Sequence, residues 1–96
     1  MIDVNVVAIG LLEFIEDCVR GAVVKSDSRE SLLMQAQCAL VVLDRMVMRK
    51  TPELHPFLAF FTDYDFPQIG RDSPEPTAAL LDALNGLLRA RKAFSG

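Results

Sequence analysis

Apolar residues recur at helical spacing along most of this chain, and polar residues fall between them. Short polar or proline-containing turns separate the apolar stretches. The pattern predicts three long helices and one short helix, over residues 4–25, 28–50, 56–64 and 74–93. We expect an all-α fold, a small antiparallel helical bundle, with a loop over residues 65–73.

The first predicted helix has two distinct faces. Its charged face contains Glu13, Glu16, Asp17 and Arg20, and we expect this face to be solvated. The opposite face is apolar and consists of Val4, Val7, Ala8, Leu11, Ile15, Cys18 and Ala22. A short strand over residues 2–9 is the alternative for the start of the chain, since these residues are rich in β-branched side chains that alternate at first.

The second predicted helix carries apolar residues on two sides. Asp27 and Glu30 have the spacing of a capping box at its start. The main stripe contains Leu32, Leu33, Ala36, Ala39, Leu40, Leu43, Met46 and Val47. On the other side a row repeats every seven residues with a cysteine beside it, and it contains Met34, Cys38, Val41 and Met48. This row is either a second contact with the core or a surface for self-association.

The two remaining helices are predicted from proline-containing starts. Pro56 either bends the helix or restarts it, which leaves a short helix whose rings we expect to fill the core: Phe57, Phe60 and Phe61. Ser73 and Pro74 open the last helix as an N-cap and a first-turn proline. Its apolar stripe contains Leu80, Leu81, Leu84, Leu87 and Leu88.

The composition limits the class of protein. The 96 residues form one domain, residues 1–96, yet 51% of them are hydrophobic, which favours burial of the excess against a partner chain, identical or not. We expect a homodimer. A net charge of −3 argues against nucleic-acid binding, which needs a positive field. No apolar run reaches the roughly 20 residues that cross a membrane. We expect a cytoplasmic protein with reduced Cys18 and Cys38, both as small core residues.

The sequence contains no recognisable catalytic or metal-binding pattern. His55 is the single histidine, and no cysteine pair or glycine-rich phosphate loop accompanies it. We therefore expect no cofactor, no metal and no enzymatic activity. The main hypothesis is a non-enzymatic protein–protein interaction module, an inhibitor, adaptor or dedicated chaperone. A small-molecule-binding bundle, with a pocket between the phenylalanines and the methionines, is an alternative.

One acidic aromatic segment is a candidate partner surface. Residues 53–82 contain six acidic residues and a single base, Arg71. Within them four consecutive residues combine charges with rings: Asp63, Tyr64, Asp65 and Phe66. Charge would steer a basic partner toward such an edge and the rings would anchor it. The alternative is a solvated loop in which Phe66 belongs to the core.

The strings "HPFLAFFTDYDFP" and "RDSPE" resemble the second half of the small acidic four-helix immunity proteins that neutralise nuclease colicins. The resemblance covers about a third of the chain, as a rough share of its length. It implies that Asp63, Tyr64 and Asp65 would contact a toxin, which makes an immunity-like antagonist of a basic nuclease a further alternative. This sequence has one tyrosine where that family has an adjacent pair, and its first half is more apolar.

Overall fold

The structure is a computed structural model, which describes residues 4–45, 65–72 and 74–95. Over these ranges it is all-helical. Its elements are helix α1 (Val4–Val24), the 3₁₀ helix η1 (Ser26–Ser28), and helices α2 (Arg29–Leu43), α4 (Phe66–Asp72) and α5 (Pro76–Ser95). Residues 4–9 are helical, so the alternative of a strand there is wrong. The short helix predicted over residues 56–64 lies outside the described residues.

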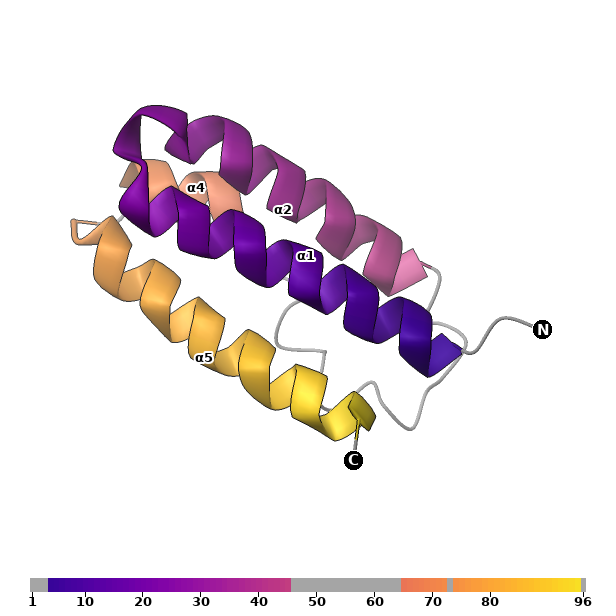
Figure 1. The fold of residues 1–96 in the computed structure, drawn as a ribbon. Helices are drawn as coiled ribbons and strands as arrows, with labels where there is room; N and C mark the ends of the chain where they lie inside the picture. Colours follow the sequence, from indigo (N-terminus) through magenta and orange to yellow (C-terminus); the bar gives the residue numbers. More distant parts are fainter. Residues whose placement is uncertain (1–3, 46–64, 73, 96) are drawn as a thin grey trace.

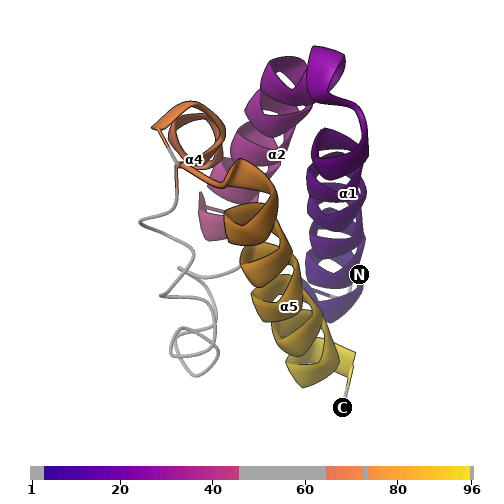
Figure 2. The same cartoon turned by 90° about the vertical axis from the view of Figure 1, so that its left-hand side faces the viewer.

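Helix α1 lies at the centre of the fold. It packs against α2 on one side and α5 on the other, while α4 lies against α2 and touches α5 (Figures 1 and 2). The core contains Ala8, Leu12, Ile15, Val19, Ala22, Leu33, Ala36, Leu40, Leu43, Phe66, Leu80, Ala83, Leu87 and Ala90. None of the described helices combines the length and the apolar character needed to cross a membrane.

The connection between α1 and α2 differs from the predicted capping box. Asp27 belongs to the 3₁₀ turn that precedes α2, so the N-cap of α2 is Ser28, which makes no side-chain cap hydrogen bond. Instead the Nε of Arg29 donates to the carbonyl of Ala22 at 2.8 Å. This bond satisfies a carbonyl in the last turn of α1 and ties the two helices together.

Residues 66–72 form helix α4, so the prediction of a loop over residues 65–73 is wrong. The reason is capping at its first turn. The side chain of Asp65 accepts a hydrogen bond from the N–H of Gln68 at 3.1 Å, as an N-cap does. The side-chain oxygen of Gln37, on α2, accepts from the N–H of Phe66 at 3.0 Å. Pro67 lies in the first turn of α4, where a backbone N–H would have no acceptor within the helix, so the missing N–H of proline costs no hydrogen bond.

Helix α4 approaches α2 closely at Gly70. A Cβ atom at this position would lie 2.6 Å from Cδ1 of the buried Leu33. That separation is shorter than van der Waals contact between carbon atoms allows. Glycine therefore permits the packing of α4 on α2.

Helix α5 begins at Pro76, not at Pro74 as predicted. The N–H of Ala79 donates to the carbonyl of Glu75 at 3.2 Å, which closes the first turn after the proline. The predicted leucine stripe is largely buried, with one exception. Leu81 is 47% exposed and lies away from the core.

Candidate functional site

An apolar groove runs between α1 and α2, and we call it the α1–α2 groove. Its volume is about 400 Å³. Three residues of α1 and α2 expose much of their side chains here, Phe14 by 46%, Met34 by 52% and Val42 by 40%. The complete lining is Leu11, Phe14, Met34, Gln35, Cys38, Ala39 and Val42. No charged side chain is among these residues.

Further apolar residues of α1 and α2 are exposed to solvent. Val6 on α1 is 64% exposed and Val41 on α2 is 41% exposed. Gly10 lies between Val6 and Phe14 in sequence, at four-residue spacing, and is also exposed. We call the groove together with the adjoining Val41 the α1–α2 apolar face, whereas helical spacing places Val6 on the same side of α1 as Glu13 and Asp17. Water contact with so many large apolar groups is unfavourable, and such faces in soluble proteins mark interaction sites.

The residues predicted for self-association lie partly in this face. Met34 and Cys38 line the groove, and Val41 is exposed beside it. Val42, which the seven-residue row left out, lines the groove because four-residue steps from Met34 through Cys38 stay on the side near α1. Met48 lies outside the described residues. Their role in self-association stays a prediction.

The two cysteines differ in their environments. Cys18 is buried, as expected for a core residue, whereas Cys38 is exposed, so its prediction as a core residue is wrong. Burial raises the pKa of the Cys18 thiol above its usual value, and the nearby Asp17 carboxylate raises that pKa further.

We predict a large difference in reactivity between these thiols. A thiol reagent such as Ellman's reagent should modify Cys38 within the folded protein, because the thiolate is the reactive form and this thiol reaches solvent. Cys18 should react only after denaturation, since burial both shields the sulfur and keeps it protonated. Counting modified thiols by mass spectrometry before and after unfolding checks this. The Cys38→Ser variant is the control and should show no fast reaction; two fast thiols in the native wild type would contradict the prediction.

The charged face of α1 is not fully solvated, which corrects the prediction for Glu16. The Glu16 side chain is only 3% exposed and contacts Arg91 of α5. The Nε of Arg91 lies 2.9 Å from Oε2 of Glu16 as an ion-pair contact, and its Nη2 donates to Oε1 at 3.4 Å. Glu13 adds a longer contact to Arg91, at 3.9 Å. The pair joins α5 to α1.

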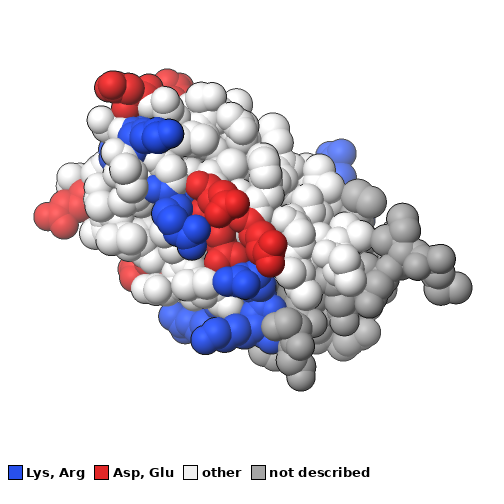
Figure 3. All heavy atoms as spheres, viewed as in Figure 1, with Lys and Arg blue, Asp and Glu red and all other residues white. Residues whose placement is uncertain are grey.

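Figure 3 shows these charges as acidic side chains over α1 with basic side chains on either side. A shallow pocket of about 210 Å³ lies among Glu13, Glu16, Asp17, Arg20 and Arg91. Its acids already have basic neighbours, such as the exposed pair of Asp17 and Arg20 at 3.3 Å. In the part of the chain that the structure describes, no group of three histidine, cysteine or acidic side chains is placed to hold a metal ion.

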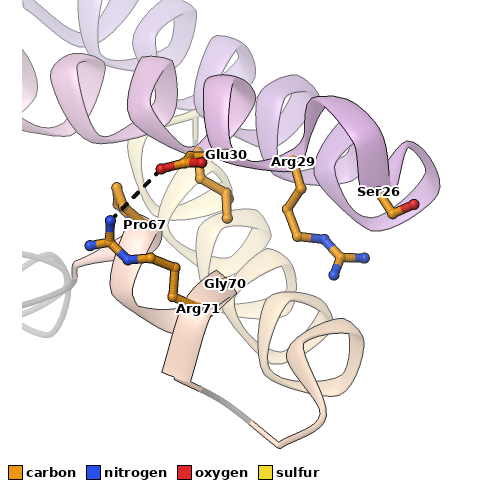
Figure 4. A pocket seen from close by; sticks show the side chains of 7 residues that line it. Ser26, Arg29, Glu30, Pro67, Gly70 and Arg71 are labelled. Atoms are coloured by element: carbon orange, nitrogen blue, oxygen red, sulfur yellow. Dashed lines mark ion pairs between the residues drawn. The ribbon is translucent and has the colours of Figure 1, made fainter.

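A third hollow, of about 250 Å³, lies where η1 and α2 meet α4. Arg71 points toward Glu30, at 3.8 Å, while the guanidinium of Arg29 extends away from that pair (Figure 4). Because the two guanidinium groups do not converge, they form no clamp for an anion.

The acidic aromatic segment is described only in part. Phe66 is fully buried, so its ring belongs to the core. The prediction that Phe66 contacts a partner is therefore wrong, and the alternative of a core residue holds. Asp65 is exposed, but its carboxylate caps α4. Asp63 and Tyr64 lie outside the described residues, as do Phe57, Phe60 and Phe61 of the predicted ligand pocket. The toxin-contact role and the ligand pocket stay predictions.

Signals for these features were present in the sequence. Asp65 stands two residues before Pro67, which is a pattern of helix starts. Ile9 lies seven residues before Glu16 and is half-buried against the core, so both are on the side of α1 that α5 covers.

No protein-family model matches this chain, and no curated protein and no solved structure resembles it significantly. What the chain does is therefore inferred from its own residues.

Proposed function

We propose that this chain is a non-enzymatic protein-binding module whose docking surface is the α1–α2 groove. The observation that carries this proposal is the exposure of Phe14, Met34 and Val42 along one groove without a charged side chain in its lining. An adaptor, an inhibitor or a dedicated chaperone would use such a surface in the same way.

The shape of the groove favours a helix as the bound element. A groove between two packed helices accepts a third helix, whose apolar residues at spacings of three and four enter it. Gln35 is the single polar side chain in the lining, so the groove selects apolar side chains and makes few hydrogen bonds. Phe14 and the unbranched Met34 can adapt to different partner side chains.

Cross-linking through Cys38 tests this proposal directly. The exposed thiol lies in the groove, so a maleimide-linked benzophenone can be attached there while the buried Cys18 stays unmodified. The labelled full-length chain is mixed with an extract of its native host and irradiated. We expect cross-links to a small and reproducible set of protein chains, which mass spectrometry then identifies.

The matched control moves the same label to an exposed apolar position on α5, with the double variant Cys38→Ser and Leu81→Cys. Leu81 is as exposed as the groove residues but lies on another helix. We expect the Cys38-specific cross-links to disappear in this control, and also when Met34→Glu and Val42→Glu are introduced into the labelled chain. Identical cross-links from both label positions would contradict the proposal.

A further inference from the structure

We draw no further inference here: the strongest candidate, the apolar groove between α1 and α2 around Phe14 and Met34, belongs to the surface already proposed for protein binding, and nothing in the structure shows what covers it.

Discussion

Phe66→Ala should lower the free energy of unfolding by about 3–5 kcal/mol, the usual cost of removing a buried phenylalanine ring. Phe66 is fully buried and heads the set of largest fully buried side chains. It is also the first residue of α4, so its ring fixes this short helix to the core that α1, α2 and α5 share. A helix of seven residues is not stable by itself, and its order depends on this contact.

Urea denaturation followed by circular dichroism measures this effect. Phe14→Ala is the matched control, because the same ring is removed from a position that is 46% exposed, and it should cost about 1 kcal/mol in dilute protein. If Phe66→Ala does not fold, Phe66→Leu should still fold and lose no more than about 1.5 kcal/mol. A loss below about 1 kcal/mol for Phe66→Ala would contradict the position of the ring in the core.

The long helices could be predicted because their apolar periodicity extends over several turns. Helices α1 and α5 lie within two residues of their predicted bounds. Helix α4 could not be recognised from periodicity, since it has only two turns and contains a proline and a glycine, both typical of loops. Its stability comes from capping by Asp65 and Gln37 and from burial of Phe66, and two of these three contacts depend on how α4 packs on the other helices.

The candidate site could be predicted only in outline. The sequence indicated an apolar row on the outer side of α2 through Met34 and Cys38, because helical spacing alone places these residues together. It did not indicate Phe14 or Leu11 as the opposite wall. That pairing depends on how far α1 is rotated against α2, which many small core contacts decide together, and no short pattern in the sequence contains this information.

The same limit applies to the ion pair of Glu16 and Arg91. Seventy-five residues separate the two in sequence, so their contact follows from the packing of α5 on α1. A carboxylate that loses most of its hydration needs a close positive charge, and Arg91 provides it from the last turns of α5. The pair therefore makes one position of α5 on α1 more favourable than its neighbours. Sliding α5 along α1 by one turn would leave Glu16 buried without a counter-charge.

Arg91→Met should lower the free energy of unfolding by about 2–4 kcal/mol, because it leaves the Glu16 carboxylate buried without its partner. The double variant Glu16→Met with Arg91→Met should return to within about 1 kcal/mol of the wild type, since two apolar side chains of similar length remove the buried charge. Urea denaturation of the wild type, the two single variants Glu16→Met and Arg91→Met, and the double variant at neutral pH gives the coupling free energy between the two positions.

A surface pair on the same face gives the matched comparison. Arg20 and Asp17 are 58% and 75% exposed, so Arg20→Met should cost no more than about 0.5 kcal/mol. The large effect of Arg91→Met would then come from the burial of Glu16 and not from the loss of a positive charge as such. If the double variant were as unstable as Arg91→Met, packing of the arginine stem would explain the loss. The double variant restores the free energy of unfolding only if the unpaired charge of Glu16 caused the loss. A double variant that stays unstable would therefore mean that the ion pair does not set the position of α5.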